Sequence, residues 1–282
     1  MNTPVTHRCA VLGSPIAHSL SPLIHRTAYD VLGLHGWRYD AFEVDEAGLG
    51  DFIASCGPEW VGLSCTMPLK RRLLDFGEPS LRARTLQSGN TYVFARDGRP
   101  ALVDNTDVAG LLEPIRRAGV ERAASAILVG SGATGRSALL ALAELGVRDV
   151  LVVARDARRA RDSLEPVASP LGVLLDVRPW GVPLTARRDV LISVVPLTLP
   201  TTMVRGLLPL TRLVFDVRYG FGPSPFAEPA AAAGTPFLGG VDMLVAQAIG
   251  QIRLFTGLTC PLQPLLDAVG AELARRAAAR DA

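Results

Sequence analysis

Lysine is almost absent from this sequence of 282 residues. Lysine and arginine together number 29, and Lys70 is the single lysine among them, so arginine fills the other 28 positions. A guanidinium group stays charged in proteins, whereas the ammonium group of lysine can release its proton. The pattern therefore predicts a chemical role for Lys70, and chance survival of one lysine is the alternative interpretation.

Other scarcities narrow the class of protein. The four cysteines form no C-x-x-C pair and lack zinc-site spacing, which predicts free thiols and no metal site. The net charge of +2 comes without a concentrated basic block, so neither nucleic acid nor a membrane surface is an expected partner. No apolar run approaches the roughly 18 residues of a membrane span, and no signal-peptide pattern is present. We expect a cytoplasmic protein that binds small molecules.

What is present fits a globular chain of two domains, with 49% hydrophobic and 20% charged residues. The first hundred residues alternate apolar strands, at 8–12, 38–44, 60–64, 91–95 and 101–103, with helical stretches that begin near Ser21. From Ser125 the alternation becomes a regular βαβ series, with strands at 126–129, 150–153, 173–177, 190–194 and 213–217 and helices at 134–145 and 157–168. This pattern predicts an α/β fold with a doubly wound parallel sheet in its second part. Further helices are expected at 107–118, 242–256 and 262–280.

A glycine-rich turn joins the first strand of the βαβ series to its helix. It reads G-S-G-A-T-G, and its residues are Gly130, Ser131, Gly132, Ala133, Thr134 and Gly135. In this context the first glycine permits a tight turn, the second lets the backbone approach a pyrophosphate, and the third allows close packing of helix on strand. The segment predicts a dinucleotide site, with a glycine turn that binds no ligand as the alternative.

The end of the next strand indicates which dinucleotide is bound. NAD-binding domains usually place an acidic residue about 20 positions after the third glycine, and here that position is Arg155, followed by Arg158 and Arg159. Guanidinium groups suit the 2′-phosphate of NADP. Asp156 could instead bind a ribose hydroxyl, and a solvated basic helix start needs no ligand; NADP is the favoured cofactor.

Hydroxyl groups and an imidazole gather after the first strand, where residues 13–22 read G-S-P-I-A-H-S-L-S-P. The carboxyl ends of strands in open α/β sheets commonly bind ligands. Ser21 could simply be a helix N-cap with Pro22 at the first helical position. That interpretation does not account for Ser19.

With this segment the chain begins to resemble the shikimate dehydrogenase family, whose opening motif is G-x-P-I-x-H-S-x-S-P. The resemblance continues in order at residues 62–70 (G-L-S-C-T-M-P-L-K), 89–91 (G-N-T) and 104–110 (D-N-T-D-V-A-G). After the glycine turn follow residues 216–219 (D-V-R-Y) and 240–248 (G-V-D-M-L-V-A-Q-A). These ordered blocks cover nearly the whole chain.

The resemblance implies a role for each matching residue. Lys70 and Asp107 would contact the reacting hydroxyl and share its proton, Ser19 and Ser21 would bind the substrate carboxylate, and the remaining substrate contacts would be Ser64, Thr66, Asn90, Tyr219 and Gln247. The cofactor would contact the glycine turn, Arg155 and Arg159. It would also contact Val217, Gly240 and Met243. A surface lysine after Pro68 and an N-cap at Asp107 are the alternatives for the catalytic pair.

The chain departs from the family pattern at three places. Ser64 replaces an asparagine, Arg155 lacks the flanking residues of an N-R-T segment, and residues 193–196 read S-V-V-P where the family has N-A-T. The first change shortens a side chain expected to reach the substrate. The other two concern only the cofactor site.

The resemblance therefore implies an NADP-dependent oxidoreductase that reversibly reduces 3-dehydroshikimate to shikimate, in the pathway to chorismate and the aromatic amino acids. Residues 1–106 plus 242–282 would form an α/β substrate-binding catalytic domain, and residues 107–241 a Rossmann-like NADP-binding domain. We expect a monomer or a homodimer. A dehydrogenase acting on quinate or aminoshikimate is the nearest alternative, and a non-catalytic ligand sensor is an alternative from another class.

Overall fold

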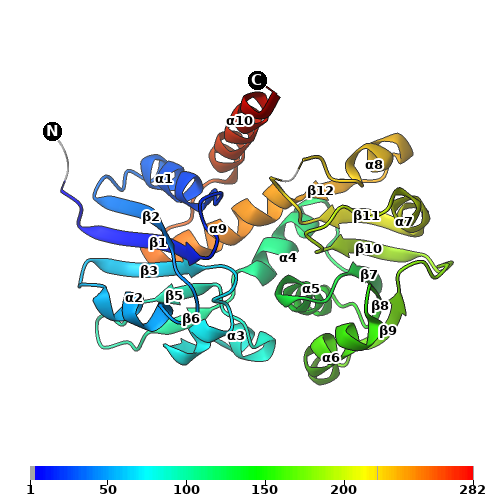
Figure 1. Ribbon diagram of the computed structural model, residues 1–282, viewed down its shortest axis with the longest axis horizontal. Helices are drawn as coiled ribbons and strands as arrows, with labels where there is room; N and C mark the ends of the chain where they lie inside the picture. Colours follow the sequence, from blue (N-terminus) through cyan, green and yellow to red (C-terminus); the bar gives the residue numbers. More distant parts are fainter. Residues whose placement is uncertain (1–3, 221, 282) are drawn as a thin grey trace. The chain divides into compact units, whose positions relative to one another are not determined.

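The computed structural model describes residues 4–220 and 222–281, and the chain divides into two compact units. Unit 1 comprises the chain up to Thr106 together with the part from Gln247 onward, and unit 2 is Asp107–Ala246. Each unit contains a six-stranded sheet (Figure 1), which confirms the α/β class predicted from the sequence. Within the described residues, no helix has the length and apolar character needed to cross a membrane.

Unit 1 is built on a mixed sheet with the strand order β2-β1-β3-β5-β6-β4. Its strands are β1 (His7–Gly13), β2 (Trp37–Glu43), β3 (Trp60–Cys65), β4 (Glu78–Pro79), β5 (Thr91–Val93) and β6 (Leu102–Asp104). Strands β1, β2 and β3 are parallel, whereas β5 runs antiparallel to both β3 and β6. The carboxyl ends of β1, β3 and β6 and the amino end of β5 therefore meet at one edge of the sheet.

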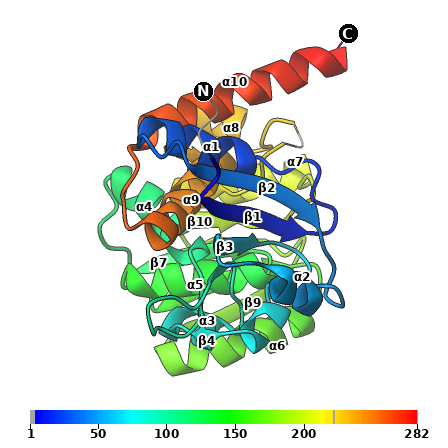
Figure 2. The same ribbon diagram turned by 90° about the vertical axis from the view of Figure 1, so that its left-hand side faces the viewer.

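Alternation of apolar side chains along β1 explains why both faces of this sheet are covered. Ala10 and Leu12 point into one core, and Cys9 and Val11 point into the other. The first core also contains residues of α2 (Leu49–Ser55), η1 (Arg72–Asp75) and α3 (Leu81–Leu86), while the second includes residues of α1 (Ser21–Val31) and α9 (Gly240–Thr256). The last helix, α10 (Leu262–Asp281), packs against α1 (Figure 2).

Unit 2 contains a fully parallel sheet with the strand order β12-β11-β10-β7-β8-β9. Its strands are β7 (Ser125–Val129), β8 (Asp149–Ala154), β9 (Leu174–Pro179), β10 (Arg188–Ser193), β11 (Thr211–Asp216) and β12 (Phe237–Gly239). The order reverses between β7 and β10, as in doubly wound dinucleotide-binding folds. Ligands of such sheets bind outside the carboxyl ends of the strands at this reversal.

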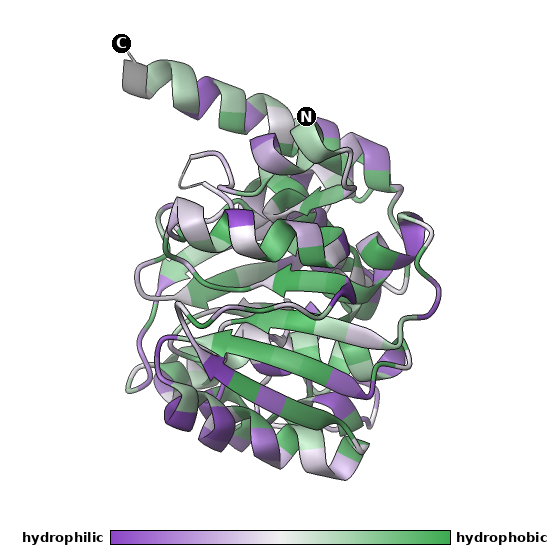
Figure 3. Cartoon of the chain, turned by 90° about the vertical axis from the view of Figure 1, so that its right-hand side faces the viewer, coloured by the Kyte–Doolittle hydropathy of each residue, from purple (hydrophilic) through white to green (hydrophobic). Residues whose placement is uncertain are grey.

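The strands of unit 2 are mainly apolar because helices cover both faces (Figure 3). The helices are α4 (Asp107–Arg117), α5 (Ala133–Glu144), α6 (Ala157–Ala168), α7 (Thr201–Leu207) and α8 (Ala227–Ala233), with short 3-10 turns η2 (Ser169–Leu171) and η3 (Leu208–Leu210). One core joins Ile127 and Val129 of β7 to Val204 of α7 and Ala230 of α8. Helix α5 packs on β7, and α6 packs on β8 and β9.

Candidate active site

The glycine turn after β7 has the backbone conformation that its sequence predicts. Gly130 has φ +102°, a value that favours glycine. A Cβ atom on Gly135 would lie 3.2 Å from the Gly130 carbonyl oxygen, so the third glycine allows α5 to pack closely on the turn. A Cβ on Gly132 would have no neighbour within 4 Å. The backbone at Gly132 is therefore open to an incoming ligand.

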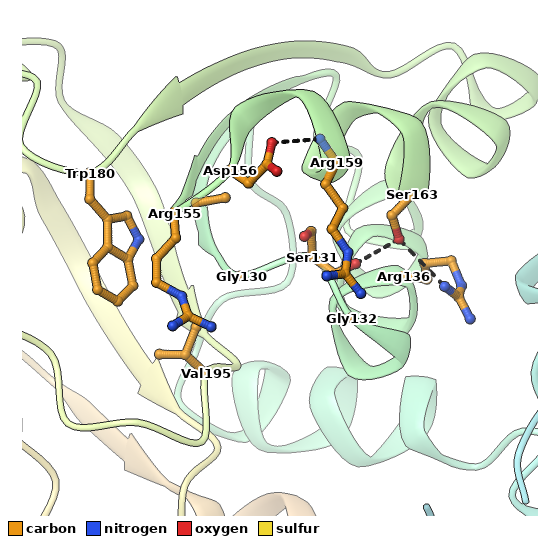
Figure 4. A pocket seen from close by; sticks show the side chains of 11 residues that line it. Gly130, Ser131, Gly132, Arg136, Arg155, Asp156, Arg159, Ser163, Trp180 and Val195 are labelled. Carbon is orange, nitrogen blue, oxygen red and sulfur yellow. Dashed lines mark hydrogen bonds between the residues drawn. The ribbon is translucent and has the colours of Figure 1, made fainter. Parts of the chain in front are cut away.

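A pocket of about 440 Å³ opens beside this turn. Gly130, Ser131 and Gly132 form one wall, and Figure 4 shows guanidinium groups of Arg155, Arg159 and Arg136 around it; Ala154, Asp156, Ser163, Trp180 and Val195 complete the lining. The Ser163 hydroxyl donates to the Ser131 carbonyl oxygen over 2.7 Å and so ties the turn to α6. Three guanidinium groups and the start of α5 suit a phosphorylated ligand.

The structure separates the roles of Arg155 and Asp156. The Asp156 carboxylate is the N-cap of α6 and accepts a hydrogen bond from the Arg159 backbone N–H over 2.9 Å (Figure 4). Arg155 is exposed, and its guanidinium carbon lies 6.0 Å from the centre of the Trp180 ring. Asp156 thus has a structural role that needs no ribose, which favours the NADP interpretation of this strand end.

The other predicted cofactor residues lie at neighbouring strand ends of unit 2. Val217 follows β11, and its N–H donates to the Ser193 carbonyl oxygen over 3.0 Å. A Cβ on Gly240 would lie 2.4 Å from the Val217 carbonyl oxygen, so this glycine lets α9 begin close to the β11 end. Met243 is buried in the first turns of α9. Ala133 and Thr134 are the first, partly buried residues of α5.

The S-V-V-P departure from the family pattern packs against the glycine turn. A Cβ on Gly130 would lie 2.9 Å from side-chain atoms of both Val194 and Val195. Val194 and Val195 therefore pack on the glycine turn, and Val195 also lines the pocket beside it. The Asp216 carboxyl, at the end of the neighbouring strand β11, is buried. Burial raises the pKa of Asp216, and the hydrogen bond from the Ser224 hydroxyl opposes that shift.

The predicted substrate residues of unit 1 share one edge of its sheet. Thr66 follows β3, Asn90 precedes β5, and Ser19 lies in the loop between β1 and α1. The loops after β1 and β3 are joined because the Ser14 N–H donates to the Met67 carbonyl oxygen over 3.1 Å. A neighbouring hydrogen bond runs from the Thr66 N–H to the Leu12 carbonyl oxygen over 2.9 Å. These backbone bonds fix the two loops relative to each other.

The N-cap interpretation of Ser21 is wrong. Ser21 is the first residue of α1, and the cap position is Leu20, which makes no side-chain capping bond. Instead, the Ser21 N–H donates to the Ser19 hydroxyl oxygen over 3.3 Å. The loop is also bound from α10, since the Arg276 guanidinium donates to the His18 carbonyl oxygen over 3.0 Å. The two serines are thus held in one short turn.

Asn90 is the centre of a buried polar cluster. Its side-chain oxygen accepts hydrogen bonds from the Thr106 N–H and the Thr91 hydroxyl, each over 2.8 Å. Its side-chain nitrogen donates to the Thr106 hydroxyl oxygen over 3.0 Å, and that hydroxyl lies 3.5 Å from the Gln247 side-chain oxygen. The cluster brings two predicted substrate residues, Asn90 and Gln247, into one hydrogen-bond network.

Lys70 lies beside this cluster. It occupies the turn after β3, not a helix, and its side chain is partly buried. Its carbonyl oxygen accepts a hydrogen bond from the Gly89 N–H over 2.8 Å, which places the only lysine next to the residue that precedes Asn90. Burial raises the pKa of the Cys65 thiol to about 12, and the charge of Lys70 opposes this shift. Lys70 is therefore not the exposed surface lysine of the alternative interpretation.

Ser64 is buried and forms hydrogen bonds with other side chains of the protein. It is 3% exposed; its hydroxyl accepts a hydrogen bond from the Tyr39 hydroxyl over 2.6 Å and donates to the Gln251 side-chain oxygen over 2.8 Å. The single hydroxyl hydrogen of Ser64 thus points to Gln251. The predicted contact between Ser64 and the substrate stays a prediction.

Besides the cofactor residues, two of the residues predicted to act on or bind the substrate belong to unit 2. Asp107 is buried at the first position of α4. Tyr219 is partly buried in the loop after β11. The neighbouring Arg218 guanidinium holds this loop by donating to the Pro223 carbonyl oxygen over 2.6 Å and to the Thr198 hydroxyl over 2.9 Å.

Sequence reasoning missed several residues that border these sites. Arg136 follows the third glycine of the turn, so its place in the first turn of α5 could have been noticed. Trp180 reaches the cofactor pocket from the end of β9, for which the sequence holds no signal. Tyr39 and Gln251 contact Ser64 from 25 and 187 residues away.

The fold and the two clusters define a two-domain α/β protein with a dinucleotide pocket in one unit and a polar, lysine-containing edge in the other. Residues 11–92 match the family described as the shikimate dehydrogenase substrate binding domain, and residues 240–269 match the shikimate 5′-dehydrogenase C-terminal domain. The chain is 33% identical, over 94% of its length and 97% of the relative, to shikimate dehydrogenase (NADP(+)) of Methanothrix thermoacetophila.

Two solved structures extend this likeness to three dimensions. Shikimate dehydrogenase of Mycobacterium tuberculosis has a TM-score of 0.80 and 36% identity, covering 94% of this chain and 99% of that one. Shikimate 5-dehydrogenase of Thermus thermophilus, solved with NADP(H) and shikimate, has a TM-score of 0.79 and 29% identity, covering 96% and 99%. The chain belongs to the shikimate dehydrogenase family.

Proposed function

We propose that this protein catalyses the reversible, NADPH-dependent reduction of 3-dehydroshikimate to shikimate. The observation that carries the proposal is the position of Lys70. The only lysine of the chain is joined through its backbone to Gly89, beside the buried Asn90 cluster, at the sheet edge that carries the predicted substrate residues. A non-catalytic sensor would have no need to keep Lys70 and Asp107 together with these residues.

The pocket of unit 2 fits NADP. Gly132 presents open backbone for the pyrophosphate, and Arg155 with Arg159 offers charge-assisted hydrogen bonds to the 2′-phosphate. Val217, Gly240 and Met243, at the β11 end and the start of α9, would border the nicotinamide side. When bound, NADP supplies the hydride acceptor, or as NADPH the hydride donor.

The proton is the task of Lys70 and Asp107. Oxidation of an alcohol requires an acceptor for the hydroxyl proton, and reduction of the ketone requires a donor at the same oxygen. An ammonium group that can release its proton and a carboxylate that can accept one together serve both directions. Lys70 holds the proton at the reacting oxygen, and Asp107 orients or exchanges it.

The remaining residues bind and orient the substrate. Ser19 and Ser21 donate hydroxyl hydrogen bonds to the substrate carboxylate, and Thr66, Asn90, Tyr219 and Gln247 hold the ring hydroxyls. Residues 1–106 plus 242–282 act as the substrate domain, and residues 107–241 as the NADP domain. We further propose that the protein works in the cytoplasm as a monomer or homodimer.

The test is the rate at which reduced cofactor appears when candidate alcohols are offered. Shikimate with NADP should give the highest kcat/KM among the four combinations of shikimate or quinate with NADP or NAD. A higher value with quinate, or with an amino-substituted analogue, would replace the proposed substrate. Binding of NADP or shikimate without any turnover would indicate a sensor.

A further inference from the structure

A directional chain of hydrogen bonds runs behind the substrate edge of unit 1. The Gln251 side-chain nitrogen donates to the Asn90 carbonyl oxygen and to the Thr91 hydroxyl oxygen, each over 3.1 Å. A backbone carbonyl can only accept, so the amide orientation of Gln251 is fixed. Its side-chain oxygen must then be the acceptor for the Ser64 hydroxyl, and the Ser64 oxygen is the acceptor for Tyr39.

The same logic fixes Asn90. The Thr106 backbone N–H can only donate, so the atom of Asn90 that faces it is the side-chain oxygen. Thr91 accepts from Gln251 and donates its own hydrogen to that same oxygen. The chain of hydrogen bonds therefore runs from Tyr39 through Ser64, Gln251 and Thr91 to Asn90. The side-chain nitrogen is the donating end of Asn90, and one of its two hydrogens goes to the Thr106 hydroxyl oxygen over 3.0 Å.

Burial makes this order costly to disturb. Tyr39 is fully buried, and Ser64, Asn90 and Gln251 are each at most 3% exposed, so a reversed amide would leave a polar atom without water. His25, also fully buried, stacks on the Tyr39 ring with centres 3.9 Å apart. Its Nε2 atom lies 3.4 Å from the Gln251 side-chain oxygen. Since that oxygen accepts, Nε2 carries the hydrogen. Burial lowers the pKa of His25 to about 3, which favours the neutral ring near pH 7.

We propose that Gln251 is a positioning residue: through the Asn90 carbonyl oxygen and Thr91 it holds Asn90, together with the Thr106 N–H, so that the Asn90 side-chain nitrogen is the donor to a substrate hydroxyl. This inference rests on the proposed function, since it assigns the substrate contact of Asn90. It also explains the departure at Ser64, because the short serine fits between Tyr39 and Gln251, and its hydroxyl acts on the substrate through Gln251.

Gln251→Glu tests the inference with little change in shape. It replaces the donating nitrogen by an oxygen that faces the Asn90 carbonyl and the Thr91 hydroxyl. At pH 9 the KM for shikimate should rise about 10-fold, the value of roughly one hydrogen bond, while kcat and the KM for NADP stay within about twofold. Gln263→Glu, the same change at an exposed site on α10, should alter none of these constants.

The pH dependence of the defect separates positioning from a general structural effect. A protonated carboxyl can donate where Gln251 donates, so the KM ratio of Gln251→Glu to wild type should fall toward one as pH decreases from 9 to 5.5. The titratable groups that border Gln251 are His25 on α1 and Tyr39 on β2. Burial lowers the pKa of His25 to about 3 and raises that of Tyr39 well above its ordinary value, so neither titrates in this range.

A ratio that does not change with pH, or equal losses in kcat and in the KM for NADP, would overturn the inference. If Gln251→Glu does not fold by circular dichroism, the double change Tyr39→Phe with Ser64→Ala keeps it testable. That variant removes both groups upstream of Gln251 and should raise the shikimate KM about threefold at every pH; an unchanged KM would overturn the inference. Absence of shikimate turnover in the wild type would overturn the proposed function and this inference with it.

Discussion

In the proposed cofactor site, we expect Arg155, helped by Arg159, to determine the preference for NADP over NAD. It lines the pocket beside the glycine turn, whereas the nearby exposed Arg158 does not. Arg155→Ala should raise the KM for NADP at least about tenfold more than the KM for NAD, because only NADP carries the 2′-phosphate that a guanidinium binds through charge-assisted bonds. Steady-state kinetics with both cofactors measures this ratio. Arg158→Ala is the matched control, and equal losses with NADP and NAD in Arg155→Ala would remove the assignment.

His25 predicts a pH dependence of stability. Burial lowers its pKa to about 3 from the ordinary 6.5, and the hydrogen bond to Gln251 opposes this shift only partly. Above pH 6.5 the imidazole is mostly neutral in the folded and in the unfolded protein. Between pH 6.5 and about pH 3 the unfolded protein binds a proton at His25, whereas the folded protein does not. The free energy of unfolding should therefore fall as pH decreases through this window, with His25 contributing about 2 kcal/mol of loss between pH 7 and pH 5.

Urea unfolding at both pH values measures this loss. His25→Phe keeps a ring against Tyr39 but cannot take up a proton. It should lose about 2 kcal/mol less than the wild type over the same interval. Identical losses in the two proteins would show that His25 is not the group responsible.

At the level of single residues, sequence motifs allowed candidate site residues to be named. Residues whose partners lie far away along the chain could not be named. Ser19, Asn90 and Lys70 could be named because their neighbours in the chain carry the pattern. Gln251 and His25 could not, since they come together across 226 residues and only the packing of α1 against α9 makes them partners. Ser21 was open to an N-cap interpretation because its residue type suits that position.

Helix α9 illustrates how an element is positioned for function. It carries both Gln247 and Gln251, and it lies against β3 at Gly62, where a Cβ atom would come within 2.2 Å of the Phe255 ring and 2.9 Å of the Tyr92 carbonyl oxygen. The absence of a side chain at Gly62 therefore allows the close contact between helix and sheet. The positions of the two glutamines beside Asn90 depend on that contact.

Gly62→Ala should lower the free energy of unfolding by about 1–3 kcal/mol through overpacking. Adding Phe255→Leu should recover part of the loss by making room. Gly270→Ala is a control of opposite sign, since Gly270 lies inside α10 with nothing near its Cβ position, and the change should stabilise by up to about 1 kcal/mol. Chemical unfolding of the three variants checks the order; a neutral Gly62→Ala would contradict the packing account.

Long, periodic elements were predicted well from the sequence. Helix α6 was placed at 157–168, where it lies, and the predicted helix at 134–145 differs from α5 by one residue at each end. The short elements α2, α3, α7, α8, β4 and β12 were missed, because none exceeds seven residues and such segments show less than two full turns or only a few alternations. Their formation depends on the cores that they cover.

At the scale of the whole molecule, the chain leaves unit 1 and returns to it. The first division, after Thr106, follows a strand and precedes a helix, which is a pattern visible in the sequence. The return falls between Ala246 and Gln247, inside α9, whereas the sequence suggested residue 242. A continuous helix gives no compositional signal at such a point.

The central claim is that Lys70 of unit 1 and Asp107 of unit 2 act on one proton. Its most direct test is kcat for shikimate oxidation by Lys70→Arg, Asp107→Asn and the double variant, each shown to be folded by circular dichroism. Each single change should reduce kcat by about 10²–10⁴, although Lys70→Arg preserves the charge, because acid–base assistance is lost. The double variant should lose much less than the product of the two single effects, as expected for residues that act as a unit. Near wild-type turnover in a folded Lys70→Arg protein would contradict the account.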